Sequence, residues 1–300
     1  MRKGPLSLEI DANGGSEEMT VPITAIVLTY NEEKNIADCL ESVRDWVKEI
    51  FVVDSYSNDK TLEIAGIYTD KIFQNTFDNY SQQRNWAMLN LPIETKWILN
   101  LDADHRVTPE LKEELNSVFH KDGIGNIDCF LVSRRTIFMG RWIKHGGHYP
   151  VYHAILFKKG MGRCEGKLYD QHFKTEGNVN KLKGDIIDVI GDTLTSFTER
   201  HNRWATLEAE DQLHFISSSS DVIKGKRAGH DIERRRYMRE KYYKLPIFVR
   251  AFLYFFYRYF IKLGFLDGKE GLIFHFLQGF WFRFLVDAKM YEKTKKALIK

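Results

Sequence analysis

From Thr24 to Leu101, short runs of β-branched and other apolar residues alternate with longer segments whose apolar residues repeat with a helical period. The short runs predict strands at residues 24–29, 49–53, 71–73 and 97–101. The longer segments predict helices at residues 33–44, 58–67 and 80–89. A chain that alternates in this way forms right-handed crossovers and a mainly parallel sheet, so an α/β fold is expected. Ligands of such sheets bind at the carboxyl ends of the strands.

The regular alternation ends near residue 130. Extended segments are expected at Phe130–Arg134 and Ala154–Phe157, so the second half of the sheet should be mixed and partly antiparallel. A long helix is expected at Thr195–Phe215, and a serine-rich linker at 217–220. With 300 residues the chain is long enough for one α/β core and an appended region. The expected parts are a disordered tail at 1–20, the α/β domain at 21–215, a basic linker or helix at 216–245 and an amphipathic helical region at 246–300.

The cysteines indicate the redox environment. Cys39, Cys129 and Cys164 are odd in number, far apart and without a Cys-x-x-Cys pair. This spacing argues against a disulfide framework and a structural zinc site, and it fits a reducing cytoplasm. The segment Met1–Thr20 lacks the apolar stretch of a secretory signal.

Two carboxylates follow the fourth expected strand, Asp102 and Asp104, with one residue between them. In a partly desolvated position, like charges repel unless a cation neutralises them. Mg²⁺ or Mn²⁺ accepts carboxylate oxygens and leaves coordination positions for phosphate oxygens. The segment therefore predicts a divalent-metal site that also binds a diphosphate. The alternative is a capped turn before a helix that starts near Pro109.

Polar residues also end the first two strands. Thr29, Asn31 and Glu32 lead into a helix, where hydroxyl, amide and backbone N–H groups can bind a nucleotide. Asp54 ends the second strand, where a carboxylate can accept hydrogen bonds from a base or a ribose. The alternatives are an ordinary turn capped by Asn31 and a helix cap at residues 58–59.

Taken in order, four segments resemble the family 2 glycosyltransferases of the GT-A fold, and more closely the bacterial branch that builds lipopolysaccharide core and exopolysaccharide. These segments are Thr29–Glu32, Val52–Thr61, Gln83–Asn85 and Leu101–Leu111. The resemblance spans roughly Pro22 to Ala209 and implies an inverting enzyme. It also implies a set of roles: Thr29, Asn31, Glu32 and Asp54 face the nucleoside, Arg84 lies near the base or diphosphate, Asp102 contacts ribose or metal, and Asp104 ligates the metal.

An inverting transfer needs a base that deprotonates the acceptor hydroxyl. In many relatives this carboxylate follows the metal motif by several tens of residues, and here Asp170 stands at that distance, with Glu165 as the second choice. The related branch usually has a His-Glu pair in this region, so the Asp-Gln-His of residues 170–172 is a departure. His172 is a candidate third metal ligand or phosphate contact; the alternative is a structural histidine.

Two further segments are candidates for the acceptor or the phosphates. The loop His145–Pro150 resembles the His-Gly-Gly-aromatic-Tyr-Pro loop of the same branch, with His148 in place of the aromatic residue. We expect this loop, with Tyr149, on the acceptor side. The long helix carries His201 and Arg203, whose positive charge would neutralise a departing diphosphate. The alternative is a solvated helix face.

The C-terminal part has the pattern of a membrane surface helix. Residues 224–244 hold nine Lys or Arg and three acidic residues, whereas the whole chain has a net charge of only +3. Arg250, Tyr254, Arg258 and Lys262 then repeat every four residues within an aromatic segment, as in helices that lie among anionic lipid headgroups. The alternative is packing on the core or on a second subunit. A spanning helix is not expected, and neither is nucleic-acid binding, since no groove-reading motif accompanies the basic stretch.

Together these features predict a peripheral enzyme on the cytoplasmic face of the inner membrane. It would move a sugar from a nucleoside diphosphate sugar, with UDP as the expected nucleotide, to a lipid-linked saccharide in surface polysaccharide or lipopolysaccharide assembly. Two other functions fit the same features. One is a polyprenyl-phosphate sugar synthase, whose acceptor needs no strong base, and the other is a non-catalytic nucleotide-binding scaffold. Nothing in the sequence specifies an oligomeric state.

Overall fold

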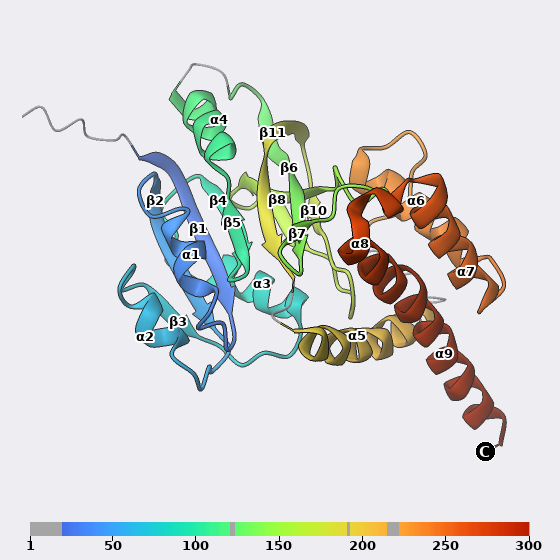
Figure 1. Ribbon diagram of the computed structural model, residues 1–300. Coiled ribbons are helices and arrows are strands. Elements are labelled where there is room, and N and C mark those ends of the chain that lie inside the picture. Colours follow the sequence, from blue (N-terminus) through green and yellow to red (C-terminus); the bar gives the residue numbers. More distant parts are fainter. Residues whose placement is uncertain (1–19, 121–123, 191–192, 215–221, 300) are drawn as a thin grey trace, which may run out of the picture.

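The computed structural model describes residues 20–120, 124–190, 193–214 and 222–299. These residues form one large mixed sheet, a two-stranded sheet beside it, and a group of C-terminal helices at one end (Figure 1). The serine-rich linker at 217–220 and all but the last residue of the expected tail lie outside the described residues.

The strands run in chain order as β1 Val21–Thr29, β2 Val47–Asp54, β3 Ile72–Gln74, β4 Trp97–Asp102, β5 His105–Val107, β6 Ile127–Phe138, β7 Arg141–Trp142, β8 Tyr152–Lys158, β9 Gly162–Cys164, β10 Phe173–Thr175 and β11 Asn178–Val189. The α-helices are α1 Ile36–Glu41, α2 Thr61–Ala65, α3 Tyr80–Asn90, α4 Pro109–His120, α5 Leu194–His214, α6 Asp231–Tyr243, α7 Val249–Phe256, α8 Gly268–Phe274 and α9 Phe282–Ile299. Three irregular helical segments join the last of these, namely η1 Tyr257–Ile261, η2 Gly264–Asp267 and η3 His275–Trp281.

The first half of the sheet is parallel, as the alternating pattern predicts. The strand order begins β3-β2-β1-β4, and β1 pairs in parallel with both neighbours. The register sets Thr29 opposite Asp54 and Leu28 opposite Asp102. The polar residues that end these three strands therefore meet at one edge of the sheet. Buried side chains such as Val27 and Leu101 fill the core behind that edge.

The second half of the sheet is mixed, as expected, and continues in the order β8-β6-β11-β5. β8 is antiparallel to both β4 and β6, whereas β11 is parallel to β6 and antiparallel to β5. The α/β fold class is thus confirmed. The sequence patterns did not predict β11, because Lys181, Lys183 and Gly184 interrupt its apolar residues.

The C-terminal helices carry the expected stripe of basic residues, but its two arginines face inward and only Lys262 is exposed. Arg250 and Arg258 are only 2% and 7% exposed. The Nε atom of Arg250 donates to Asp287 at 2.8 Å, and that of Arg258 donates to the carbonyl of Gly146 at 2.7 Å. The expectation that the stripe faces lipid headgroups is therefore wrong for Arg250 and Arg258, because these guanidinium groups find their partners within the protein. Among the described helices, none has the length and apolarity needed to cross a bilayer.

Candidate active site

The acidic pair lies in the turn between β4 and β5. The backbone N–H of Ala103 donates to the carbonyl of Leu28 at 3.0 Å, and the carbonyl of Asp104 accepts from the N–H of Val189 at 3.1 Å. These bonds hold the turn between β1 and β11. Both carboxylates remain partly open, since the side chains of Asp102 and Asp104 are 34% and 19% exposed. The pair therefore stands at the edge where the polar strand ends meet.

Arg84 of α3 is buried beneath the acidic pair. Its guanidinium group donates to the carbonyl of Leu101 at 2.9 Å and to Oδ1 of Asp102 at 2.5 Å. Burial raises the pKa of Asp102, but Arg84 and His105 outweigh burial and lower this pKa below its ordinary value. Arg84 thus keeps Asp102 ionised and fixed in place. Arg84 lies beside Asp102, whereas its expected contact with the base or the diphosphate stays a prediction.

Asp104 lies in the opposite electrostatic environment. Burial raises its pKa well above the ordinary value, and the negative charges of Asp188 and Asp102 raise it further, against the opposing effect of Arg200. Asp188 comes from the end of β11, opposite His105 in the sheet. Such crowding of buried negative charge is unfavourable until a cation binds. A divalent ion would therefore stabilise the ionised form of this cluster.

His105 belongs to the same cluster, because the ligand atoms of Asp102, Asp104 and His105 all lie within 4.8 Å of one another. The backbone N–H of Asp102 donates to Nδ1 of His105 at 3.1 Å, and burial lowers the pKa of the ring. In the neutral tautomer that this bond favours, Nε2 carries the proton and lies 3.8 Å from Oδ2 of Asp102. His105 thus orients the carboxylates, and the two aspartates offer the oxygen ligands that suit Mg²⁺ or Mn²⁺. Sequence reasoning assigned His105 no role, although it directly follows Asp104.

The loops after β1 and β2 form one surface. Oδ1 of Asn31 accepts from the N–H of Asn58 at 2.9 Å, and the N–H of Asn31 donates to Oγ of Ser57 at 2.8 Å. Asn31 has a φ of 53°, a left-handed conformation that asparagine tolerates better than most residues. Tyr30 and Tyr56 are each 56% exposed on these loops, so their rings are available to stack on a base.

Thr29, Glu32 and Asp54 lie at the same edge. Thr29 is buried, and its Oγ1 atom has no hydrogen-bond partner among the described residues. A bound ligand would satisfy this hydroxyl. Asp54 is fully buried and accepts from the backbone N–H of Ser57 at 2.9 Å, so it shapes the loop that follows β2. The charge of Glu32 acts on Asp104 and therefore lies on the side toward the acidic pair.

α5 directs Arg200 toward the acidic pair. The positive charge of Arg200 acts on Asp104 and opposes the rise of its pKa. His201 faces the other way: it is 3% exposed, it stacks on Phe197 with ring centroids 3.8 Å apart, and burial lowers its pKa to about 4. Arg203 is exposed. The structure thus brings Arg200 to the site, whereas sequence reasoning selected its neighbours, because the period of a helix does not show which face meets the site.

Glu165 and Asp170 lie on the segment between β9 and β10. Glu165 has no exposed surface, and its carboxylate accepts from Arg236 and from two backbone N–H groups. The side chain of Asp170 is 37% exposed and forms an ion pair with Arg239. Burial raises the pKa of Asp170, but Arg239 and His172 outweigh burial and hold this pKa well below its ordinary value. Asp170 is therefore ionised and reachable from solvent, whereas Glu165 is enclosed.

A row of polar side chains connects Asp170 with the acidic cluster. Arg134 donates to Asp188 at 3.1 Å and lies 2.9 Å from Nε2 of His153, whose ring centroid lies 5.7 Å from that of His172. Burial lowers the pKa of His172 to about 3. His172 is not among the three grouped metal-ligand candidates of the described residues. It lies beside Asp170, so its assignment as a metal ligand has no support in this geometry.

The loop at 145–150 is anchored to the C-terminal helices and to β11. Nδ1 of His145 lies 2.6 Å from Oδ1 of Asp267, and the hydroxyl of Tyr149 donates to Asp185 at 3.0 Å. Lys262 accepts through its carbonyl from the N–H of Gly146 at 2.8 Å. The C-terminal helices therefore hold the loop that was expected on the acceptor side.

His148 ties this loop to the strands of the site. Its Nδ1 atom lies 2.9 Å from a nitrogen of Arg258, and its Nε2 atom lies 3.1 Å from Oγ1 of Thr136. Thr136 pairs with Asp188 across β6 and β11. The loop therefore lies beside the strand pair that carries Asp188, and burial together with Arg258 lowers the pKa of His148 well below its ordinary value.

Known proteins resemble the chain over most of its length. An uncharacterized glycosyltransferase of Rickettsia bellii is 27% identical over 282 residues, which are 92% of this chain and 88% of that protein. The lipopolysaccharide core biosynthesis glycosyltransferase LpsC of Rhizobium meliloti is 26% identical over 280 residues, 91% of this chain and 93% of LpsC. The mannosyltransferase PcManGT from Pyrobaculum calidifontis, solved with GDP-Man and Mn²⁺, is 14% identical, with 91% of this chain and 87% of that chain covered and a TM-score of 0.49.

The family assignment follows from the sheet and from the sequence comparison. The parallel half of the sheet aligns the strand ends at Thr29, Asp54 and Asp102 in the arrangement that the GT-A resemblance implied. The family model described as "Glycosyl transferase family 2" matches residues 24–178, just over half of the chain. The chain therefore belongs to glycosyltransferase family 2.

Proposed function

We propose that this glycosyltransferase moves a sugar from a nucleoside diphosphate sugar, with UDP as the expected nucleotide, to a lipid-linked saccharide in surface polysaccharide or lipopolysaccharide assembly. The observation that carries the donor proposal is the edge where β1, β2 and β4 end. It holds an unsatisfied buried hydroxyl at Thr29, two exposed tyrosines and, next to them, the crowded carboxylates of Asp102 and Asp104. A nucleoside fits the first group, and a diphosphate with its metal fits the second.

Asp102 and Asp104 would hold Mg²⁺ or Mn²⁺. When bound, the ion supplies positive charge that stabilises the leaving diphosphate. Arg84 fixes Asp102 by an ion pair, and Nε2 of His105 lies 3.8 Å from Asp102 and 4.0 Å from Asp104. Arg200 adds a positive charge on the side of α5, where it would meet the negative charge that develops on the diphosphate.

Asp170 is the proposed base. The acceptor hydroxyl would lose its proton to this carboxylate and attack the anomeric carbon, while the bond between that carbon and the diphosphate oxygen breaks on the opposite face. Asp170 is preferred over Glu165 because an acceptor can reach a side chain that is 37% exposed but not one without exposed surface. In the anchored loop, the side chain of His145 is 36% exposed and is the proposed contact for an acceptor sugar.

Substitution of the two carboxylates separates their roles. Asp170→Asn should lower turnover about 10²-fold or more while donor binding stays unchanged. Glu165→Gln should instead lower stability, because it leaves the buried guanidinium of Arg236 without its ionic partner. Near-full turnover of Asp170→Asn would contradict the assignment of the base.

The proposed location is the cytoplasmic face of the inner membrane, with peripheral attachment to anionic lipid. The support is the outer surface of the C-terminal helices, where Phe252, Phe256, Phe260 and Ile261 are between 48% and 60% exposed. An exposed apolar surface of this kind is typical of membrane or protein contacts. Cosedimentation with phosphatidylglycerol vesicles tests the proposal, and the absence of binding at both low and high salt would contradict it.

The donor is identified by a screen of nucleotide sugars with and without Mn²⁺. A bound donor at a hundredfold excess over its dissociation constant stabilises the fold by ~2.7 kcal/mol, which is measurable as a rise in melting temperature. Turnover with polyprenyl phosphate alone as the acceptor would favour a polyprenyl-phosphate sugar synthase. Tight nucleotide binding without any release of nucleoside diphosphate would favour a non-catalytic scaffold.

A further inference from the structure

The segment from residue 245 to 276 contains seven Arg, Lys, Asp, Glu or His residues, yet its surface is mostly apolar. Large apolar side chains from α7, η1, η2, α8 and η3 are exposed along it. Of its charged side chains only Lys262 and Lys269 are exposed; the half-buried Glu270 lies 3.7 Å from Arg141, and the remaining charged groups are buried. The two charged side chains that are exposed on this surface are therefore positive, which complements an anionic lipid leaflet.

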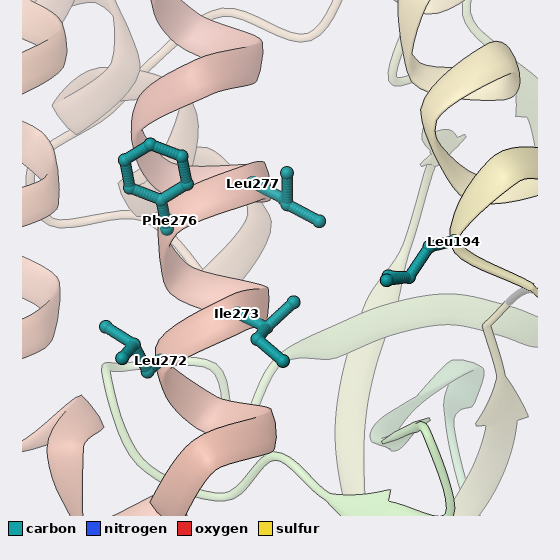
Figure 2. A pocket seen from close by; sticks show the side chains of 5 residues that line it. All are labelled: Leu194, Leu272, Ile273, Phe276 and Leu277. Atoms are coloured by element: carbon teal, nitrogen blue, oxygen red, sulfur yellow. The ribbon is translucent and has the colours of Figure 1, made fainter.

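A groove opens on this surface, between α8–η3 and the first turn of α5 (Figure 2). It is shallow and widely open to solvent, with a volume of about 460 Å³. Its lining consists only of aliphatic and aromatic side chains, which are Leu194, Leu272, Ile273, Phe276 and Leu277. Figure 2 shows Ile273 and Leu277 on the side of the helix that faces Leu194.

The groove lies close to the proposed active site. Leu194 begins α5 and Arg200 follows it by six residues, which is about 9 Å along a helix axis. Phe197 lies between them and packs against Phe138 and Phe274 beneath the groove, with ring centroids 5.3 Å from Phe138. Ile273 and Leu277 of the groove pack against the same cluster as Ile190, which follows Asp188 by two residues, so the groove lies beside the end of β11 that carries Asp188.

We propose that the groove binds the hydrocarbon chain of the acceptor's lipid carrier, which enters from the leaflet and leaves the saccharide at the active site. This proposal rests on the proposed function. In it, the protein recognises the lipid of the acceptor as well as the sugar. An extended peptide would bring backbone N–H and C=O groups that the lining of the groove cannot satisfy. A hydrocarbon chain leaves no such group unpaired, and it gains the free energy of apolar burial.

Photolabelling tests the proposal directly. The full-length protein is mixed with phosphatidylglycerol vesicles that contain a phospholipid with a diazirine at the end of one acyl chain. After illumination, mass spectrometry locates the adducts. We expect adducts on the groove residues, above all on Ile273 and Leu277. Adducts confined to the outer side chains such as Phe256 and Phe260, with the groove unlabelled, would overturn the proposal.

Two variants of Leu194 sharpen the test. Because Leu194 is 42% exposed, neither Leu194→Arg nor Leu194→Trp should disturb folding. The arginine places a charge in the groove and the tryptophan fills it, so each should lower labelling of Ile273 by about tenfold or more, the loss expected for one leucine-sized contact. Leu89→Arg, at a leucine that is 83% exposed on α3, is the matched control and should change nothing. Unchanged labelling of Ile273 in both Leu194 variants would overturn the proposal.

Two further measurements separate this proposal from its rivals. Hydrolysis of the donor releases nucleoside diphosphate without any lipid acceptor. The Leu194 variants should therefore keep this hydrolysis activity. If the wild-type protein releases no nucleoside diphosphate from any donor, the proposed function fails. If it releases nucleoside diphosphate but the groove stays unlabelled, only the lipid subsite fails. Sedimentation velocity tests whether a second copy of the chain occupies the groove instead. A dimer that Leu194→Arg dissociates would overturn the proposal and indicate a subunit interface.

Discussion

Arg258→Met tests whether the basic stripe of the C-terminal helices faces the protein. The guanidinium of Arg258 donates to the carbonyl of Gly146 at 2.7 Å and to the hydroxyl of Tyr254 at 2.8 Å, and it lies 2.9 Å from Nδ1 of His148. The side chain is only 7% exposed, so water cannot replace these bonds in the variant. The substitution keeps most of the apolar volume and removes the three hydrogen bonds.

The expected cost follows from the groups left behind. Two buried acceptors, the carbonyl of Gly146 and Nδ1 of His148, lose their partner, and each such loss costs about 1–3 kcal/mol. We therefore expect a loss of ~3 kcal/mol in the free energy of unfolding, or a fall of roughly 6 °C or more in melting temperature for a chain of this size. The loop at 145–150 should also loosen, so turnover should fall together with stability.

Thermal unfolding and vesicle cosedimentation are measured on the same preparations. Lys262→Met is the matched control, because Lys262 belongs to the same stripe but its side chain is exposed. It should change stability by less than about 0.5 kcal/mol. If Arg258→Met unfolds at the wild-type temperature and instead loses vesicle binding, Arg258 faces lipid and the inward orientation of the stripe is refuted.

Three other substitutions test separate parts of the structure. Asp287→Asn removes the ionic partner of Arg250 in a pair whose two side chains are no more than 2% exposed, so urea unfolding should show a loss of about 3–5 kcal/mol; a loss below 1 kcal/mol would contradict the burial of this pair. Phe256→Glu should weaken cosedimentation with phosphatidylglycerol vesicles by about tenfold or more, since it replaces an exposed apolar side chain with a like charge to the lipid; unchanged binding would count against the membrane surface. Arg84→Met frees the carboxylate of Asp102, so calorimetric titration should show weaker Mn²⁺ binding, and affinity equal to the wild type would contradict the positioning role of Arg84.

The parallel half of the fold could be predicted because β1, β2 and β4 consist mainly of buried apolar residues. The residues at the ends of those strands followed from the same pattern, since the carboxyl ends of neighbouring parallel strands must meet. Thr29, Asp54 and Asp102 accordingly lie at one edge. β11 could not be predicted in this way, because its first half is mostly exposed and reads as polar sequence.

The rest of the site depends on contacts between distant segments. Asp188 and Arg134 come from β11 and β6, and neither strand carries a recognisable motif. The helix that carries Arg200 was expected to supply cations, but His201 and Arg203 were selected from it because the helix period alone does not fix which face of α5 meets the acidic pair. The C-terminal stripe shows the same limit: its period was visible in the sequence, but Arg258 finds its partner in Gly146, 112 positions earlier.

The most direct test of the donor site is the release of nucleoside diphosphate from a nucleotide sugar by the purified protein, measured with Mn²⁺, after chelation, and after Mn²⁺ is restored. The wild-type protein should release the product only with the metal. Asp104→Asn should lower this release about a hundredfold or more at saturating Mn²⁺, because it removes a proposed metal ligand. Asp45→Asn, at an aspartate whose side chain is 55% exposed and outside the site, should behave as the wild type. Release by Asp104→Asn at the wild-type rate, or release that chelation leaves unchanged, would contradict a metal-dependent donor site at Asp102 and Asp104.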